Sequence, residues 1–372
     1  MTETSLKKSP LHEKHVALGA KMADFGGWQM PIEYPGGGVI REHTAVRERV
    51  GIFDVSHLGK ARVVGTGAAD FCNACFTNDL RKVEPPKAQY TMCCDEQSGG
   101  VVDDLIQYVK SDDEVFLIPN AANTTEVVRR MREKLPEGLE LTNLHEEYGV
   151  IAVQGPRSED VVKALGLPTD LEYMSFAEAQ WNGRPVIVCR TGYTGEKGYE
   201  LLPTWDNTPA VWDALVEAME PFDGLPCGLG ARDTLRTEMG YALHGHELSM
   251  DITPNMARAG WAVGWGKESF WGKEVLAEQK AAKDCRLSWG LLVTGKGIPR
   301  KDCVIRSAGG EDDAVIGVVT SGTMSPTLKQ GIALCLLDRG AKEGDEVVVV
   351  VRGREVAATV TKPPFVQGGA AS

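Results

Sequence analysis

The sequence contains no run of about 18 apolar residues, the length at which a membrane-spanning helix is suspected, so no membrane span is expected. Its first ten residues lack the apolar core of a signal peptide, and they carry an acidic residue but no arginine, which argues against a transit peptide. Basic residues are in the minority, and the net charge of −12 argues against a nucleic-acid partner. We therefore expect a cytoplasmic protein with no membrane or nucleic-acid partner.

Cysteine is present without a disulfide or metal pattern. The nine cysteines are an odd number and are scattered, which is typical of a reducing compartment. Cys72 and Cys75 have metal-like spacing, but no second pair follows at the distance of a zinc site, and both fall in an expected helix over 68–76. His244 and His246 lack a third ligand nearby. The sequence predicts no metal.

A complete dinucleotide-binding fingerprint is also missing. Residues 61–70 run from a strand-like into a helix-like pattern and contain Gly65 and Gly67, but Asp70 replaces the third glycine. Asp70 is better explained as a first-turn residue of a helix, where a negative charge is favourable. No flavin, nicotinamide or pyridoxal-phosphate signature is found elsewhere.

The composition, with 42% hydrophobic and 25% charged residues, is that of a globular protein, and 372 residues suffice for two or three domains. Up to about residue 280, helices and strands mix without regular βαβ alternation, which favours α+β lobes over a doubly wound sheet. Helices are expected over residues 12–22, 44–50, 68–76, 121–134, 157–165, 207–219 and 229–239. Strands are expected over residues 60–64, 89–94, 100–109, 114–118, 185–189 and 199–202.

From about residue 285 the pattern changes to short strands separated by glycine turns. These strands are expected over residues 287–294, 303–306, 314–319, 332–336, 346–351 and 354–361. Such spacing predicts an antiparallel barrel or sandwich. We place the domain boundary near residue 280, which divides the chain into residues 1–280 and a C-terminal barrel domain, 281–367, and we expect residues 368–372 to be disordered.

The most informative segment is the loop Arg190-Thr-Gly-Tyr-Thr-Gly-Glu-Lys-Gly198. Its three glycines at a spacing of three predict a tight loop between strands. Glu200 begins the second strand, where a fixed carboxylate could accept two parallel N–H bonds from a flat, amidine-like ring edge. The alternative is a surface hairpin with solvated charges.

A second segment, Gly99-Gly-Val-Val-Asp-Asp-Leu-Ile106, brings two adjacent carboxylates onto a strand. Because strand side chains alternate, Asp103 and Asp104 are expected on opposite faces, so they form no dyad and only one can face a given cavity. Desolvation of the aspartate that faces the cavity would oppose its charged form. Such a carboxyl group is suited to proton transfer or to stabilising a cation. The alternative is a hairpin-end aspartate that binds backbone N–H groups.

A third segment, Gly228-Leu-Gly-Ala-Arg-Asp-Thr-Leu-Arg236, opens like a helix. Arg232 and Arg236 are four residues apart on one face, where two guanidinium groups could clamp a carboxylate. Ion pairs within the helix, with Asp233 and Glu238, are the alternative.

Taken in order, these segments resemble the aminomethyltransferase family, the T-proteins of the glycine cleavage system. The resemblance runs from Pro10 to Phe365, and the concurrence of its segments is specific. The matching segments are Asp24-Phe-Gly-Gly-Trp-Gln-Met-Pro31, Gly51-Ile-Phe-Asp-Val-Ser-His57, Thr77-Asn-Asp79, Gly99-Gly-Val-Val-Asp-Asp-Leu105, Asn120-Ala-Ala-Asn123, Gln154-Gly-Pro156, Arg190-Thr-Gly-Tyr-Thr-Gly-Glu196, Gly228-Leu-Gly-Ala-Arg-Asp233 and Thr320-Ser-Gly-Thr-Met-Ser-Pro326.

The resemblance implies an α+β fold: two lobes related to the ferredoxin-like fold, interleaved in sequence or not, and a C-terminal antiparallel β-barrel-like domain around a central folate channel. It also implies the reaction. An aminomethyl group arrives on the lipoyl arm of the H-protein, and its carbon passes to tetrahydrofolate, giving 5,10-methylenetetrahydrofolate and ammonia. Tetrahydrofolate and lipoylated H-protein are therefore the expected substrate and partner.

By the same resemblance, Asp104 matches the catalytic aspartate and Glu200 the carboxylate that binds the pterin edge. The other positions that match the folate site are Tyr90, Asn120, Tyr193 and Arg232.

The chain departs from the family pattern in two places. Leu58 stands where many members have methionine, which keeps an apolar wall in the folate site. Val366 and Gln367 replace a basic or aromatic residue, which leaves open a contact from this end to the glutamate tail of folate.

Two alternatives are open. A folate-dependent demethylase of the dimethylglycine or sarcosine type usually carries a fused flavin domain, for which the chain has neither fingerprint nor room. A non-catalytic, folate-binding iron–sulfur assembly protein typically carries the motif Lys-Gly-Cys-Tyr-x-Gly-Gln-Glu, and the nearest segment, Arg300-Lys-Asp-Cys303, does not match it.

Overall fold

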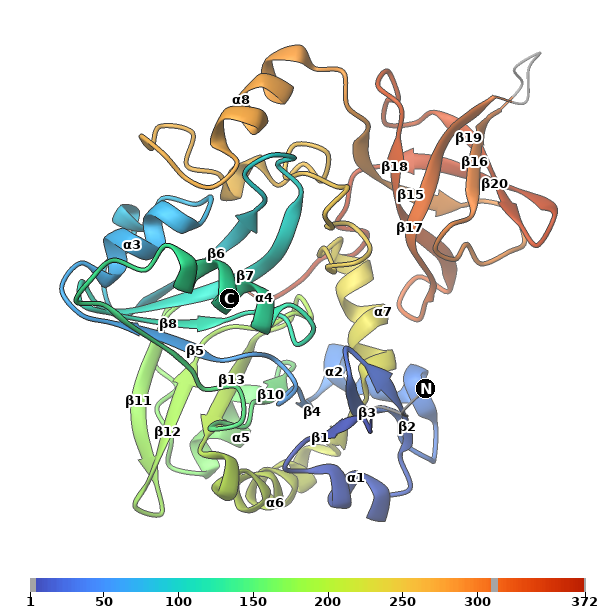
Figure 1. The fold of residues 1–372 in the computed structure, drawn as a ribbon. Coiled ribbons are helices and arrows are strands. Elements are labelled where there is room, and N and C mark those ends of the chain that lie inside the picture. Colours follow the sequence, from blue (N-terminus) through green and yellow to red (C-terminus); the bar gives the residue numbers. More distant parts are fainter. Residues whose placement is uncertain (1–4, 309–313, 371–372) are drawn as a thin grey trace.

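The structure, a computed structural model, describes residues 5–308 and 314–370 (Figure 1). The strands of these residues form a three-stranded, a five-stranded and a six-stranded sheet and a closed six-stranded barrel. Mixed helices and sheets with an antiparallel barrel confirm the predicted α+β fold class. Within the described residues, no helix is both long and apolar enough to cross a bilayer.

One lobe is a five-stranded antiparallel sheet in the order β6-β7-β8-β5-β9. Its strands are β5 (Ala61–Val64), β6 (Lys87–Cys94), β7 (Val101–Ser111), β8 (Glu114–Ile118) and β9 (Glu140–Asn143). Helices α3 (Ala68–Cys75) and α4 (Thr124–Glu133) cover one face, and the 3-10 turn η1 (Leu80–Lys82) follows α3. The cysteine pair is free and buried there, with Phe71 and Met131, so Cys72 and Cys75 are packing residues.

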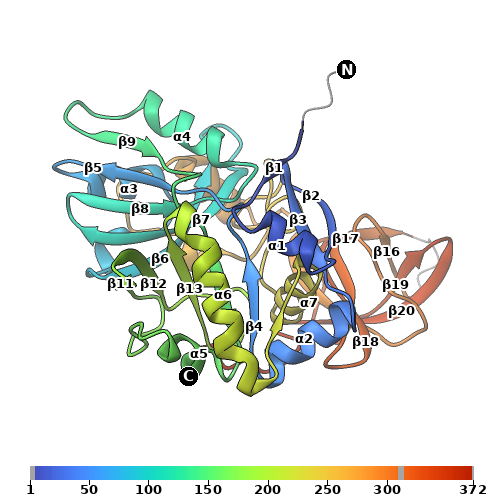
Figure 2. The ribbon, with the colours of Figure 1, turned by 90° about the horizontal axis from the view of Figure 1, so that it is seen from below.

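The other lobe is a six-stranded sheet in the order β11-β12-β13-β10-β4-β14. Its strands are β4 (Gly51–Asp54), β10 (Ile151–Gln154), β11 (Phe176–Trp181), β12 (Arg184–Cys189), β13 (Gly198–Pro203) and β14 (Leu225–Pro226). Helices α5 (Ser158–Ala164) and α6 (Thr208–Met219) cover one face (Figure 2), and η2 (Trp205–Asn207) and η3 (Glu220–Phe222) flank α6. Because β4 precedes the first lobe and β10 follows it, the lobes are interleaved in sequence.

The uncovered faces of the two sheets pack against each other through Phe53, Leu202, Tyr108 and Phe116. Strand alternation therefore decides which side chains of each strand point into the space between the two sheets. On β7, Leu105 and Val109 join the core beside α3 and α4, whereas Ile106 and Tyr108 face the other sheet. On β13, Tyr199 and Leu201 join the core beside α5 and α6, whereas Leu202 faces the first lobe. Even-numbered positions of both strands thus meet between the sheets.

The N-terminal segment differs from its prediction. Helix α1 (His12–Ala17) ends five residues before the predicted end at residue 22, because Gly19 takes a left-handed φ of +73°. The chain then forms a hairpin, β2 (Lys21–Phe25) and β3 (Trp28–Glu33), which also pairs with β1 (Lys7–Lys8). Sequence patterns missed this hairpin because its strands do not alternate cleanly between buried and exposed residues.

The remaining elements join the lobes to the barrel. They are α2 (Gly38–Glu48), α7 (Leu229–Met239), η4 (Gly260–Ala262) and α8 (Lys273–Ala282). Helix α7 lies between the lobes and the barrel (Figure 1) and contacts α2, β3 and β17. Helix α8 continues through residue 280 and ends at Ala282, so no break between elements lies at residue 280 itself. The domain boundary near residue 280 stays a prediction.

The barrel closes in the order β15-β18-β17-β16-β19-β20. Its strands are β15 (Leu287–Val293), β16 (Val304–Ser307), β17 (Val315–Ser325), β18 (Gln330–Leu337), β19 (Glu346–Val351) and β20 (Arg354–Thr361), each within a few residues of its prediction except for the longer β17. The chain then returns to α7, where the Phe365 amide donates to the Glu238 carbonyl oxygen at 2.8 Å. Disorder of residues 368–372 stays a prediction, because 371 and 372 lie outside the described residues.

Candidate active site

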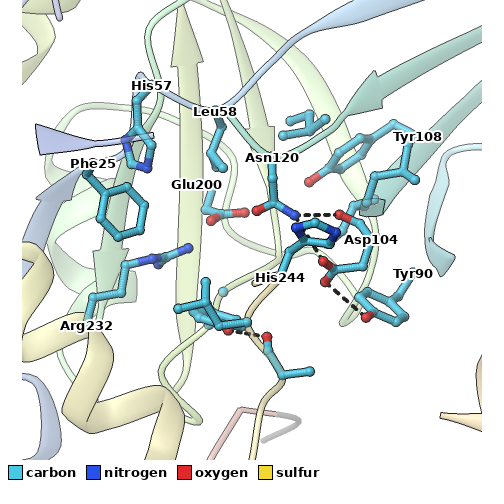
Figure 3. Close-up of a pocket in the computed structure, with 17 residues that line it drawn as sticks. Phe25, His57, Leu58, Tyr90, Asp104, Tyr108, Asn120, Glu200, Arg232 and His244 are labelled. Carbon is cyan, nitrogen blue, oxygen red and sulfur yellow. Dashed lines mark hydrogen bonds between the residues drawn. The ribbon is translucent and has the colours of Figure 1, made fainter. Parts of the chain in front are cut away.

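A pocket lies between the two facing sheets and is closed by α7 and the segment that follows it (Figure 3). All seven residues predicted for the site line it, although they come from four distant parts of the sequence: Leu58, Tyr90, Asp104, Asn120, Tyr193, Glu200 and Arg232. Val366 and Gln367 are not among its lining residues. The described residues contain no group of three or more His, Cys, Asp or Glu side chains that could hold a metal.

Asp104 enters the pocket from β7. Its Oδ2 accepts a hydrogen bond from the Tyr90 hydroxyl at 3.0 Å, and its Oδ1 accepts one from Asn120 Nδ2 at 3.0 Å (Figure 3). Burial raises the pKa of Asp104 above its usual value, although these hydrogen bonds and the nearby His244 oppose the rise. The carboxyl group is therefore held in place but is easier to protonate than a solvated aspartate.

Asp103 lies on the other face of β7, as predicted, and is fully buried outside the pocket. Its oxygens accept hydrogen bonds from the Asn120 amide and side chain, both at 2.9 Å, and from Asn123 Nδ2 at 2.7 Å. Burial and the neighbouring Asp104 raise its pKa. As predicted, only Asp104 faces the pocket, but the two carboxyl groups are connected, because Asn120 Nδ2 donates to both of them.

Glu200 reaches the same space from β13, and its carboxylate points into the pocket (Figure 3). It is 8% exposed, and its Oε2 accepts a hydrogen bond from Thr191 Oγ1 at 2.5 Å. No residue of the preceding loop, 190–198, is fully exposed, and five of its nine residues are buried, which rules out the surface hairpin. Its glycines differ in their roles: Gly195 has a φ of +83°, whereas a Cβ at Gly192 or Gly198 would lie 2.2 Å from the Gln154 side chain.

Arg232 projects from α7 and lies over the ring of Tyr193, with 4.7 Å between guanidinium carbon and ring centroid. Its Nη1 is buried and has no hydrogen-bond partner among the described residues. A buried donor of this kind is satisfied when a ligand supplies an acceptor. Tyr193 is fixed in turn, because its hydroxyl donates to the Ala242 carbonyl oxygen.

Arg236 does not join Arg232 in a clamp. Its guanidinium group is buried away from the pocket and binds Asp233 at 2.7 Å and Glu247 at 2.8 Å. The alternative of an ion pair within the helix is correct for Asp233, whereas Glu238 pairs with Arg47 at 2.8 Å instead. Sequence spacing placed both arginines on one face but could not show which carboxylates tertiary structure would bring to them.

Sequence reasoning missed several lining residues, among them Phe25, His57, Tyr108 and His244. The first two lie inside segments that carry the family resemblance, which was the available signal. His244 was weighed only as a metal ligand. Its Nε2 donates to the Val101 carbonyl oxygen at 2.9 Å, so its Nδ1 accepts from Asn123 Nδ2 at 3.0 Å.

The wall segment that carries Leu58 is held by a buried lysine. Lys60 Nζ donates to the carbonyl oxygens of Ser56 at 2.9 Å and Leu58 at 2.8 Å. Burial lowers the pKa of Lys60 to about 7. The lysine thus fixes the apolar side of the pocket without reaching into it.

Comparisons with known proteins agree with this architecture. Residues 11–267 match the family model of the GCVT N-terminal domain, and residues 286–367 match that of the glycine cleavage T-protein C-terminal barrel domain. The chain is 62% identical over 361 residues to an aminomethyltransferase of a Parafrankia species, covering 97% of this chain and 98% of the relative. It is 56% identical over 359 residues to an aminomethyltransferase of Mycobacterium tuberculosis, covering 96% of each.

The structure is also similar to the crystal structure of glycine cleavage system aminomethyltransferase T from Bartonella henselae, with a TM-score of 0.92, 30% sequence identity, and coverage of 99% of this chain and 100% of that one. These findings do not favour the demethylase or the iron–sulfur assembly alternative. The chain belongs to the aminomethyltransferase family, the T-proteins of the glycine cleavage system.

Proposed function

We propose that the pocket binds tetrahydrofolate and that the protein transfers to it the one-carbon unit of aminomethyl-dihydrolipoyl H-protein, giving 5,10-methylenetetrahydrofolate and ammonia. The observation that carries the proposal is the meeting of Asp104, Glu200 and Arg232 from β7, β13 and α7 in one pocket. A polar heteroaromatic ring system needs both acceptors and donors at its edge, and this pocket offers both. A cytoplasmic location is part of the same proposal.

In this proposal Glu200 accepts the N–H groups at the edge of the pterin, while the unpartnered Nη1 of Arg232 donates to an acceptor of the folate. The rings of Tyr90, Tyr108 and Tyr193 supply flat aromatic surfaces, and Leu58 supplies an apolar one. Asn120, which donates to Asp104, positions that carboxyl group.

Asp104 would act on the transferred carbon. In the overall reaction, the carbon–sulfur and carbon–amine bonds break and two carbon–nitrogen bonds to folate form. The two protons lost by the folate nitrogens end on the sulfur and on the ammonia. A carboxylate beside the carbon stabilises its iminium-like, positively charged form and can relay one of these protons. Holding arm and folate together supplies much of the remaining acceleration.

The partner would dock through a local basic surface, since the chain carries a net charge of −12. A cavity of about 660 Å³ on the barrel provides such a surface. Its basic residues are Lys296, Arg300, Arg352 and Arg354, and none of its described lining residues is acidic. Lys301 directly follows Arg300 in the chain, and its Nζ donates to the Gly245 carbonyl oxygen, in the segment after α7, at 2.7 Å. An acidic partner bound there would lie beside a wall of the pocket.

Ammonia release tests the proposal. Purified protein, aminomethylated H-protein and tetrahydrofolate together should release ammonia and form methylenetetrahydrofolate. Omission of any one of the three should abolish rapid release. Equal release without folate or without H-protein would contradict the transfer.

A further inference from the structure

A short turn between β4 and β5 carries two side chains that line the pocket, His57 and Leu58 (Figure 3). The Nδ1 of His57 is buried there without a hydrogen-bond partner among the described residues. Backbone amides tie the turn to the fold: the Leu58 amide donates to the Val55 carbonyl oxygen at 3.0 Å, and the Gly59 amide donates to that of Pro119 at 2.8 Å. The conformation of this turn therefore sets where both side chains lie in the pocket.

The carbonyl groups of the turn are held by side chains. Lys60 Nζ donates to the carbonyl oxygens of Ser56 at 2.9 Å and Leu58 at 2.8 Å. His145 Nε2 donates to the carbonyl oxygen of His57, which lies between them in sequence, at 2.8 Å. Among the described residues, no backbone amide donates to these three consecutive carbonyl groups. Because carbonyl groups away from water are costly to leave unpaired, the turn should change conformation when its two side-chain donors are removed.

Lys60 differs from an ordinary surface lysine. Its side chain is fully buried, its Nζ lies 5.8 Å from the centroid of the Trp205 ring, and its own carbonyl oxygen accepts from the Leu144 amide at 2.8 Å. Burial lowers its pKa to about 7, and Asp54 and Glu146 oppose the fall. Because burying an ammonium group opposes folding, the role of this lysine is better sought in the turn that it shapes than in stability.

We propose that Lys60 and His145 are positioning residues for folate. By holding the turn, they place His57 and Leu58 against the bound tetrahydrofolate. Neither of the two donors lines the pocket, so both act through the backbone of the turn and not by touching a substrate. The inference rests on the proposed function and adds two residues outside the pocket that set its shape.

The two donors should affect folate binding more than the chemical step. Asp104 is held by other elements, since its carboxyl oxygens accept from Tyr90 on β6 and from Asn120 after β8. These hydrogen bonds do not involve the turn. Removal of a donor should therefore raise the Kd and the KM for tetrahydrofolate, while kcat at saturating folate stays within about twofold of the wild-type value.

The experiment compares Lys60→Met, which keeps an apolar stem but donates no hydrogen bond, with the wild type. We expect the Kd for tetrahydrofolate in titration calorimetry, and its KM in ammonia release, to rise about fivefold to tenfold. Lys267→Met is the matched control, because Lys267 is also buried but lies outside the pocket. Its Nζ likewise donates to backbone carbonyl oxygens, those of Asn73, Phe76 and Asn78. The control should change stability but neither folate constant.

A double-mutant cycle with Leu58→Ala shows whether Lys60 acts through the turn. Lys60→Met should raise the Kd for tetrahydrofolate by a smaller factor in the Leu58→Ala background than in the wild type, because one side chain that Lys60 positions is already gone. Equal factors in the two backgrounds would overturn the inference. So would an unchanged Kd in folded Lys60→Met, or an equal rise in Lys267→Met.

Should Lys60→Met not fold, His145→Phe decides. This change keeps a ring against Trp28, whose centroid is 5.2 Å from that of His145, but removes the donor to the His57 carbonyl oxygen. It should raise the Kd and the KM for tetrahydrofolate with little change in kcat, and wild-type constants would overturn the inference. If the wild-type protein bound no tetrahydrofolate, the proposed function itself would fail.

Discussion

Asp103 and Asp104 point to opposite faces of β7, yet they share one side-chain amide. Asn120 Nδ2 lies 2.9 Å from Oδ1 of Asp103 and 3.0 Å from Oδ1 of Asp104. Asn120 can bridge them because it follows the end of the neighbouring strand β8. The Asp103 carboxyl group thus helps to orient the Asn120 side chain, which in turn holds the Asp104 carboxyl group that faces the pocket.

The first prediction separates these two carboxyl groups. Asp104→Asn should lower kcat about a hundredfold or more, because a neutral amide neither stabilises a developing cation nor relays a proton. Asp103→Asn should have a much smaller effect on kcat, because Asp103 does not line the pocket. Steady-state ammonia release decides the question, and equal losses in the two variants would contradict the assignment.

The second prediction concerns pH. Because burial raises the pKa of Asp104, its charged form is populated only above a pKa higher than that of a solvated aspartate. If the charged form is the active one, kcat should fall as pH is lowered through that raised pKa. The Asp104→Asn variant should lose this acidic limb in its residual activity, and a limb that persists unchanged would assign the titration to another group.

The third prediction concerns folate binding. Glu200→Gln keeps the shape of the side chain but turns one acceptor into a donor, which should cost about 1–3 kcal/mol, or roughly five- to 150-fold in Kd. Titration calorimetry with tetrahydrofolate measures this directly. Glu178→Gln, an exposed change on β11 outside the pocket, is the control. Wild-type affinity in Glu200→Gln would remove Glu200 from the folate site.

Much of the fold follows from local sequence patterns. The helix predicted over residues 229–239 and the strands predicted over 114–118, 346–351 and 354–361 have the observed bounds, because alternation and helical periodicity are strong there. Strand alternation also predicted that only one of the two aspartates faces the pocket, and the family resemblance identified it as Asp104. The prediction that Asp104 and Glu200 lie in one site rested on the family resemblance, because the sequence of a single strand does not show which strand of another sheet will face it.

Other features depend on tertiary contacts that no local pattern carries. Helix α8 was missed, and the spacing of Arg232 and Arg236 could not show that only the first would reach the pocket. The role of Gly192 was misread as turn formation, because the neighbouring Gln154 side chain comes from another strand. His57 carried no signal beyond its place in a family segment, because an unpaired ring nitrogen is visible only in three dimensions.

The fourth prediction concerns stability. Glu238 is fully buried and joins three parts of the fold, with Arg47 on α2 at 2.8 Å and Ser325 Oγ on β17 at 2.5 Å. Burial opposes its charge, but the hydrogen bond and charge of His43, together with Ser325 and Arg47, hold its pKa at about 2. A lowered pKa stabilises the folded state above the unfolded value near 4.5, and this contribution is lost as pH falls toward 2.

Glu238→Gln should therefore lower the free energy of unfolding by about 2–3 kcal/mol at pH 7, and the difference from wild type should shrink below about pH 4. Urea denaturation at several pH values measures both. Glu217→Gln, an exposed change on α6, should leave stability unchanged at every pH. A deficit in Glu238→Gln that is constant down to pH 2.5 would show that the charge of Glu238 is not responsible.

The central claim is that one pocket between the two lobes holds folate with Glu200 at its pterin edge and Asp104 beside its reacting nitrogens. A crystal structure of the protein with bound tetrahydrofolate tests this most directly. We predict that the pterin N–H groups lie within hydrogen-bond distance of the Glu200 carboxylate and that the reacting nitrogens lie next to the Asp104 carboxyl group. Folate bound elsewhere, for example in the basic cavity of the barrel, or with its pterin turned away from Glu200, would contradict the account.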